Sequence, residues 1–318
     1  MDTKKKIILF SAIFLFSLAL TPYMIPLPDD LLTPGDLAHS KSNFIEVKGV
    51  TLHYETHSPK AHNDTVVFVH GFGGSTFSFQ NNIQPLNEAG FQVVLVDMPG
   101  FGLSERTLET NHSHKGRAEL LLALLDEIDP DSSVHWVGHS MGGNIISWIP
   151  TIDQNRTSSL TIIASPFSNS TNKKAKALLS FPPAQRALAV GFPRFITPER
   201  IATFLESAYQ RPLSSEEIEG YYLPLKIRDT HLTLIGLIRD RMSFPPDYER
   251  IQYPTLLIWG DADSWVPLEN ALDWKAAIAC NQMKIIPDAG HNVMETHSEE
   301  FNAHLIHFIL HQVPAINP

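Results

Sequence analysis

Residues 137–143 read Val-Gly-His-Ser-Met-Gly-Gly, and the fold can be inferred outward from this stretch. It ends an apolar run, Val134–Val137, and opens a helical pattern, Met141–Ile149, so Ser140 lies on a sharp turn between a strand and a helix. Glycines two positions before and after the serine let the strand and helix approach without Cβ clashes. The turn would present the hydroxyl at the carboxyl edge of a sheet and at a helix N-terminus, which favours negative charge. A structural serine in a tight turn is the alternative, but the strand and helix around it favour a nucleophile.

Short, nearly all-apolar runs on both sides of this turn predict the strands of one sheet. Runs rich in Val, Ile and Leu without alternation fit parallel strands that are covered on both faces. The runs are Thr65–Val69, Phe91–Val96, Val134–Val137, Leu160–Ala164, Thr255–Trp259 and Met283–Ile286. The helical patterns between and after them include Arg117–Ile128, Met141–Ile149, Leu268–Ala279 and Phe301–His311.

An alternating segment, residues 44–54, precedes these runs and turns at Lys48-Gly49, which predicts a β-hairpin. A hairpin followed by repeated strand–helix units predicts an α/β fold with a mostly parallel, doubly wound sheet and an antiparallel start.

The interval between Ala164 and Thr255 breaks this rhythm, because no strand pattern occurs for about ninety residues. Helical patterns over Pro198–Tyr209 and Ser214–Leu225 occur there instead. A structureless loop of that length is rare in a compact domain, so we predict an inserted helical cap. The predicted organisation is an N-terminal segment, a polar linker, a core in two parts and a cap, over residues 1–28, 29–42, 43–165 with 251–318, and 166–250.

The N-terminal segment has a positive start and an apolar continuation, the layout of an export signal. Lys4–Lys6 precede an uncharged run from Ile7 to Leu20, which has the length of a signal-peptide core with Ser17-Leu18-Ala19 as a cleavage site. Continued to Leu27, the run has about twenty residues, enough to span a bilayer. A cleaved signal and a retained anchor both remain open, and a buried core helix is a third interpretation. The lysines favour a cytoplasmic N-terminus, so we expect a membrane-attached or exported protein with its catalytic part on the periplasmic or extracellular side.

The composition excludes several classes of protein. The net charge is −10 with few basic clusters, which argues against a nucleic-acid partner. The single cysteine, Cys280, can form no internal disulfide or Cys-based zinc site. We interpret it as a small buried hydrophobe, the alternative being a catalytic cysteine that no activating motif supports. No His-Glu-x-x-His spacing occurs, so we expect no metal.

A serine nucleophile needs a base, and the base needs an orienting acid. Residues 259–267 (Trp-Gly-Asp-Ala-Asp-Ser-Trp-Val-Pro) end one predicted strand, and residues 287–292 (Pro-Asp-Ala-Gly-His-Asn) end the next. Asp263 and His291 therefore lie at the carboxyl ends of neighbouring strands, in the order nucleophile, acid, base, where loops can bring them to Ser140.

An acyl-transfer site also needs donors for the oxyanion. The N–H of Met141, directly after the nucleophile, is one candidate. The loop after Thr65–Val69, residues 70–75, reads His-Gly-Phe-Gly-Gly-Ser, and the N–H of Phe72 is the second candidate. A phosphate-binding loop is the alternative, but no lysine follows at the required spacing.

With these residues identified, the chain resembles the α/β-hydrolase superfamily, specifically its capped esterase- and lipase-like serine hydrolases, from about residue 44 to residue 312. Five motifs carry the resemblance: residues 70–74, 97–104 (Asp-Met-Pro-Gly-Phe-Gly-Leu-Ser), 138–143, 260–267 and 290–291. The resemblance implies that residues 97–104 form a structural loop near the pocket.

Departures from particular relatives narrow the function. Dehalogenases and epoxide hydrolases of the superfamily carry Asp at the position of Ser140, and carbon–carbon hydrolases usually have Asn where this chain has His139. Position 165 is Ser, which points to the later strand for the acid. There the family spacing selects Asp263 over Asp261.

We therefore expect hydrolysis of a small-molecule or lipid-like carboxylic ester through an acyl-enzyme, a reaction that implies no cofactor. The same triad could serve amide hydrolysis, perhydrolysis or carbon–carbon cleavage, and a non-catalytic ligand-binding protein is the alternative from another class. The segments Ala175–Phe181 and Ile201–Leu205 suggest an apolar acyl pocket, or else the cap's own packing.

Overall fold

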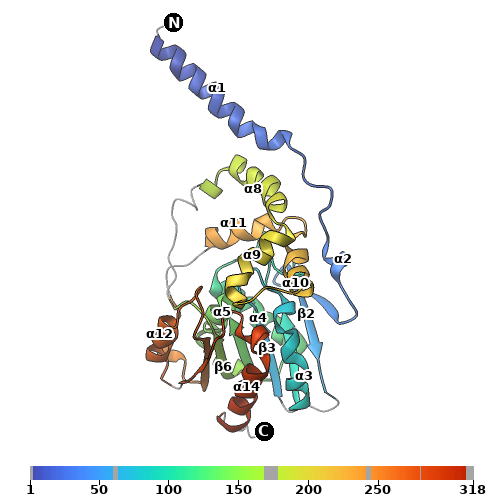
Figure 1. The fold of residues 1–318 in the computed structure, drawn as a ribbon, viewed down its shortest axis with the longest axis vertical. Helices are drawn as coiled ribbons and strands as arrows, with labels where there is room; N and C mark the ends of the chain where they lie inside the picture. Colours follow the sequence, from blue (N-terminus) through green and yellow to red (C-terminus); the bar gives the residue numbers. More distant parts are fainter. Residues whose placement is uncertain (1–2, 60–63, 168–177, 241–244, 280, 313–318) are drawn as a thin grey trace.

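The computed structural model describes residues 3–59, 64–167, 178–240, 245–279 and 281–312. The expected mostly parallel sheet is present with eight strands in the order β1-β2-β4-β3-β5-β6-β7-β8 (Figure 1). The β1–β2 and β2–β4 pairs are antiparallel, and every other pair is parallel. The strands are β1 (Ser42–Val47), β2 (Val50–His57), β3 (Asp64–Val69), β4 (Phe91–Val96), β5 (Val134–His139), β6 (Thr157–Ile163), β7 (Thr255–Gly260) and β8 (Asn281–Ile286).

The central strands are covered on both faces, as the unbroken apolar runs predict. Every residue of β5, β6 and β7 is buried, and successive residues of a strand point to opposite faces. The main covering helices are α3 (Gln80–Glu88) packed with α14 (Ser298–Gln312), α4 (His114–Ile128) packed with α5 (Met141–Ile146), and α12 (Glu269–Ala277) against β7 and β8.

The prediction of one helix over Met141–Ile149 is wrong in its extent. The segment forms α5, which ends at Ile146, and a separate short helix, α6 (Ile149–Ile152). Pro150 lies in the first turn of α6, where a helix has no use for the missing N–H.

Four longer helices fill the interval between β6 and β7. They are α8 (Pro182–Phe195), α9 (Pro198–Tyr209), α10 (Ser215–Leu225) and α11 (His231–Asp240), and no strand occurs in the described part of this interval. Figure 1 shows them between the sheet and the N-terminal helix. The helices α9 and α10 each begin at an N-cap residue: the side chains of Thr197 and Ser214 accept hydrogen bonds from the N–H groups three residues later.

The N-terminal segment forms a single helix, α1 (Thr3–Met24), which is long and apolar enough to cross a membrane. Its apolar stretch is not buried in the protein, and α1 contacts α8. Arg186 of α8 donates hydrogen bonds to the carbonyls of Pro22 (3.2 Å) and Ile25 (2.9 Å).

The segment expected to be a plain linker is docked on the segment between α10 and α11. The Leu32 N–H donates to the Lys226 carbonyl (3.0 Å), the Arg228 N–H donates to the Leu32 carbonyl (2.9 Å), and the Lys226 ammonium pairs with Asp30 (2.7 Å). A four-residue helix, α2 (Pro34–Leu37), follows. The interpretations of Cys280 and of Ala175–Ala177 fall outside the described residues.

Candidate active site

Ser140 occupies a strained turn at the carboxyl end of β5. Its φ of 51° and ψ of −115° are values that a residue with a Cβ adopts rarely, and such strain persists only where the surroundings enforce it. Two hydrogen bonds from β6 and its end do so: the Ser140 N–H donates to the Ile163 carbonyl (2.8 Å), and the Ser165 hydroxyl donates to the Ser140 carbonyl (2.7 Å).

The glycines around Ser140 are required by close backbone approach. A Cβ on Gly142 would lie 2.1 Å from the carbonyl oxygen of Val69, and one on Gly138 would lie 2.5 Å from the Gly142 carbonyl. No real Cβ tolerates such contacts with backbone, so the packing reason for the two glycines is confirmed.

The loops after β7 and β8 bring together the two other residues that the sequence selected. Nδ1 of His291 lies 2.8 Å from Oδ2 of Asp263, and both side chains are buried. The second carboxylate oxygen, Oδ1, accepts the N–H groups of Trp265 (2.8 Å) and Val266 (2.9 Å). Because backbone donors fix one oxygen, the other is held in place for the imidazole.

Asp261 has a different place. Its side chain is exposed, and Oδ1 accepts the backbone N–H of Asp288 at 2.8 Å. Asp288 itself has a φ of 57°, so this bond supports a left-handed turn. Asp261 therefore braces the loop after β7 against the loop after β8, whereas Asp263 contacts His291.

His139 links Ser140 to the His291 loop. Its Nε2 lies 3.1 Å from the His291 carbonyl, and the two imidazole centroids are 4.7 Å apart. Burial holds the pKa of His139 well below 6.5, and the nearby His291 lowers it further. The His139 ring is therefore neutral.

The loop after β3 lies directly against the serine. A Cβ on Gly71 would lie 3.0 Å from the Ser140 Cβ and 2.8 Å from Nδ1 of His139. His70 is buried, which lowers its pKa, and its Nε2 accepts the N–H of Met98 (3.0 Å). Because His70 fixes the loop as a neutral ring, Phe72 is held beside the turn that carries Ser140.

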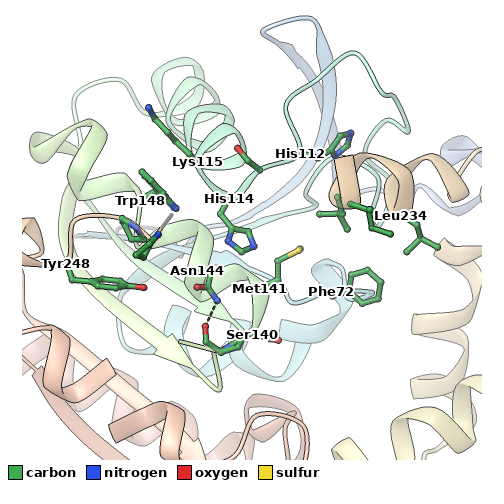
Figure 2. Close-up of a pocket in the computed structure, with 16 residues that line it drawn as sticks. Phe72, His112, His114, Lys115, Ser140, Met141, Asn144, Trp148, Leu234 and Tyr248 are labelled. Atoms are coloured by element: carbon green, nitrogen blue, oxygen red, sulfur yellow. Dashed lines mark hydrogen bonds between the residues drawn. The ribbon is translucent and has the colours of Figure 1, made fainter. Parts of the chain in front are cut away.

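A cavity of about 420 Å³ opens at Ser140, and Phe72 and Met141 both line it. Figure 2 shows the side chains of Asn144 and Met141 next to Ser140, with the ring of Phe72 beyond Met141. The other residues that line it are the apolar and aromatic Trp148, Pro166, Leu234, Leu237, Ile238, Pro245, Pro246 and Tyr248 and the polar His112, Ser113, His114 and Lys115.

The expected acyl-pocket segments do not form this wall. Ile201 and Leu205 are buried in the cap's own cluster, so the alternative of cap packing is confirmed for them. Phe181 is exposed and does not line the cavity. Three wall residues, Leu234, Leu237 and Ile238, come from α11; their apolar spacing marks a packing face of that helix but does not tell that the face meets the cavity.

Among the described residues, no group of three His, Cys, Asp or Glu side chains could hold a metal ion. A serine hydroxyl at a cavity, with a buried imidazole–carboxylate pair on the loop that His139 hydrogen-bonds, is a combination that can carry out acyl transfer.

The model of the alpha/beta hydrolase fold matches residues 64–298. This chain belongs to that family. A 2-hydroxy-6-oxononadienedioate/2-hydroxy-6-oxononatrienedioate hydrolase of Escherichia coli is 26% identical over 289 residues, which cover 86% of this chain and 96% of that protein. The expected superfamily and fold are thus confirmed, and the chain is a hydrolase.

Two solved structures share the fold at low identity. An esterase from Thermogutta terrifontis matches with a TM-score of 0.67 and 20% identity, over 85% of this chain and 98% of that one. A structure titled as a membrane phospholipase A, a bacterial virulence factor, matches with a TM-score of 0.68 and 20% identity, over 96% of each chain.

Proposed function

We propose that this hydrolase cleaves carboxylic esters through an acyl-enzyme, with Ser140 as nucleophile, His291 as base and Asp263 as the acid that orients the base. The observation that carries the proposal is a strained serine at an open cavity whose neighbour, His139, hydrogen-bonds the loop of a buried Asp263–His291 pair. A structural serine needs neither the strain nor the pair.

The chemistry follows from the 2.8 Å contact. When the Nδ1–H group of His291 donates a hydrogen bond to Asp263, Nε2 is the atom that takes the proton from the Ser140 hydroxyl as the oxygen attacks the ester carbonyl. The N–H groups of Phe72 and Met141 hold the resulting oxyanion. His291 then passes the proton to the leaving alkoxide, and in the second half it activates the water that hydrolyses the acyl-enzyme.

The substrate that we propose carries an apolar acyl group. Leu234, Leu237 and Ile238 of α11 line the cavity, and Trp148 and Tyr248 add aromatic surface to it. A cavity of about 420 Å³ has the size of ordinary small-ligand sites, which are mostly apolar with a few polar groups.

The membrane enters this proposal through α1. The helix contacts α8 of the cap, so a bilayer that holds α1 would lie next to the cap and could supply lipid-like esters. The structure titled membrane phospholipase A matches over 96% of this chain. With Lys4–Lys6 on the cytoplasmic side, the catalytic part lies outside the cytoplasm.

Covalent labelling tests the assignment. A fluorophosphonate probe should label the wild type and not Ser140→Ala, and p-nitrophenyl ester turnover should disappear with it. Ser147→Ala is the matched control, because Ser147 is a buried serine seven residues further along whose hydroxyl donates to the Asn144 carbonyl. A folded wild type that neither labels nor turns over esters would favour a ligand-binding protein instead.

Carbon–carbon hydrolysis is the second candidate, because the Escherichia coli relative is named for 2-hydroxy-6-oxononadienedioate. His139 in place of the usual Asn argues against it. Faster turnover of that dienedioate than of the best p-nitrophenyl ester would reverse the choice.

A further inference from the structure

Glu295 is a partly buried carboxylate four residues after His291, in the short helix α13 (Val293–Thr296). Its two oxygens accept three hydrogen bonds. Oε2 accepts the hydroxyl of Tyr209 (2.5 Å), and Oε1 accepts the hydroxyl of Tyr221 (2.5 Å) and the side-chain amide of Asn292 (2.7 Å). The donors come from two cap helices, α9 and α10, and from the residue that directly follows His291.

The hydroxyl of Tyr221 extends this cluster. It also accepts the Asn292 amide (2.8 Å) and lies 3.1 Å from the hydroxyl of Ser78 in the core. The cap, the His291 loop and the core therefore share one connected set of hydrogen bonds with Glu295 at its centre.

The end of α9 is also seated on both loops that carry the proposed acid and base. The indole of Trp265 lies over His291 with centroids 5.3 Å apart, and its Nε1 donates to the hydroxyl of Ser207 (2.8 Å). A Cβ on Gly290 would lie 2.2 Å from the carbonyl oxygen of Ala208, so α9 contacts the backbone next to the base directly.

We propose that Glu295 is a positioning residue that couples the docking of the cap to the placement of His291. A carboxylate in this place needs its donors, because a buried charge without them is strongly disfavoured. The cap supplies two of the three donors, so the α13 segment and the His291 loop are stable in this position only with α9 and α10 docked. The proposal rests on the proposed function in taking His291 as the base.

The electrostatics of the cluster support this coupling. Burial raises the pKa of Glu295 to about 7, although all three donors lower it, and the nearby Glu217 raises it further. Glu217 is itself paired with Arg211 (2.6 Å) at the start of α10. Burial also holds the pKa of both tyrosines above 10, so they remain donors. The carboxylate form, which can accept from every donor, therefore prevails above about pH 7.

The kinetic test compares Glu295→Gln with Glu105→Gln, a partly buried carboxylate that accepts only the Thr51 N–H in the core. We expect Glu295→Gln to lower kcat on p-nitrophenyl acetate by about tenfold with little change in KM, because small displacements of a base are costly. Its kcat–pH profile should have one fewer ionisation near neutral pH, and Glu105→Gln should match the wild type.

Two milder variants keep the carboxylate and guard against a folding failure. Tyr209→Phe and Tyr221→Phe each remove one donor, with Tyr253→Phe, whose hydroxyl bonds the distant Gln154 carbonyl, as the control. Hydrogen exchange should quicken in the backbone of residues 289–296 in both cap variants, although the substitutions lie on α9 and α10.

The outcomes separate the two proposals. A folded Glu295→Gln with wild-type kcat and pH profile, or cap variants without faster exchange in residues 289–296, would overturn the positioning role. A wild type without ester turnover would reject the proposed function, and the exchange experiment would still decide the coupling.

Discussion

The core and the cap differ in how tightly they are packed. In the core, the strands β5 to β7 are buried at every residue, and the turn at Ser140 is fixed by backbone hydrogen bonds and backbone contacts. In the cap, the helices bury a small cluster, while Phe195 and Phe204 stay 61% and 59% exposed. A large buried sheet tolerates little movement, whereas lightly packed helices open at low cost. The core can therefore hold the chemistry while the cap adapts to the substrate.

The first prediction tests whether the core holds the chemistry, and its expected effect on turnover is the largest after the loss of Ser140 itself. Asp263→Asn should lower kcat by roughly three to four orders of magnitude, because an amide at the acid position of a serine–histidine–acid site stabilises the wrong imidazole tautomer. Single-ester kinetics below the melting temperature measure it.

Asp261→Asn is the matched control, two residues away on the same loop. Its side chain braces the Asp288 N–H, and an amide oxygen can still accept that bond, so kcat should fall by about tenfold or less. An inactive Asp261 variant beside an active Asp263 variant would identify Asp261 as the acid.

The second prediction tests whether the cap wall, the part of the cavity wall formed by Leu234, Leu237 and Ile238 of α11, selects the substrate. Leu234→Trp places bulk into the cavity from α11, so kcat/KM for a long-chain ester should fall by about tenfold relative to a short one. Phe181→Ala, at an exposed cap residue outside the wall, should leave the chain-length preference unchanged. An equal loss on all chain lengths would mean that Leu234 only holds the cap together.

The sequence predicts the core of the molecule better than the cap. The strand over Phe91–Val96 is predicted to the residue, because parallel strands read as apolar runs that end where burial ends. That Ser140, Asp263 and His291 lie at strand ends follows from the strand pattern, whereas the choice of Asp263 over Asp261 follows from the resemblance to the family.

The cap wall and the Glu295 cluster could not be found that way. Which face of α11 meets the cavity depends on how the cap docks, and no local pattern encodes it. A glutamate four residues after a histidine is normally a solvated surface residue, since Glu is rarely buried unless paired. Only the folded chain brings Tyr209 and Tyr221 to it.

The third prediction concerns the seam between core and cap, where His112 packs against α11. A Cβ on Gly236 would lie 2.3 Å from Cδ2 of His112, and Nδ1 of His112 accepts from Arg117 (2.9 Å). Burial is the main cause that lowers the pKa of His112 from 6.5 to about 4, and the positive charge of Arg117 lowers it as well. The unfolded chain therefore binds more protons between these values, and stability is lost as pH falls through that window.

Urea unfolding at two pH values measures this effect. From about pH 7 to pH 5, the free energy of unfolding of the wild type should fall by about 2 kcal/mol more than that of His112→Gln, because glutamine does not titrate. Parallel losses in both proteins would show that other groups cause the acid sensitivity.

The last prediction separates α1 from the rest of the chain and should alter the chemistry least. The full-length protein should sediment with membranes, and a chain that starts at Leu27 should be soluble with kcat on a soluble ester within about twofold, because α1 contacts the cap and not the site. A chain that starts at Asp36 loses the two backbone bonds of Leu32 to Lys226 and Arg228, so its free energy of unfolding should drop by about 1–2 kcal/mol. Sedimentation of the Leu27 chain with vesicles would mean that the cap itself binds lipid, and a soluble mature protein that begins near Leu20 would identify the segment as a cleaved signal.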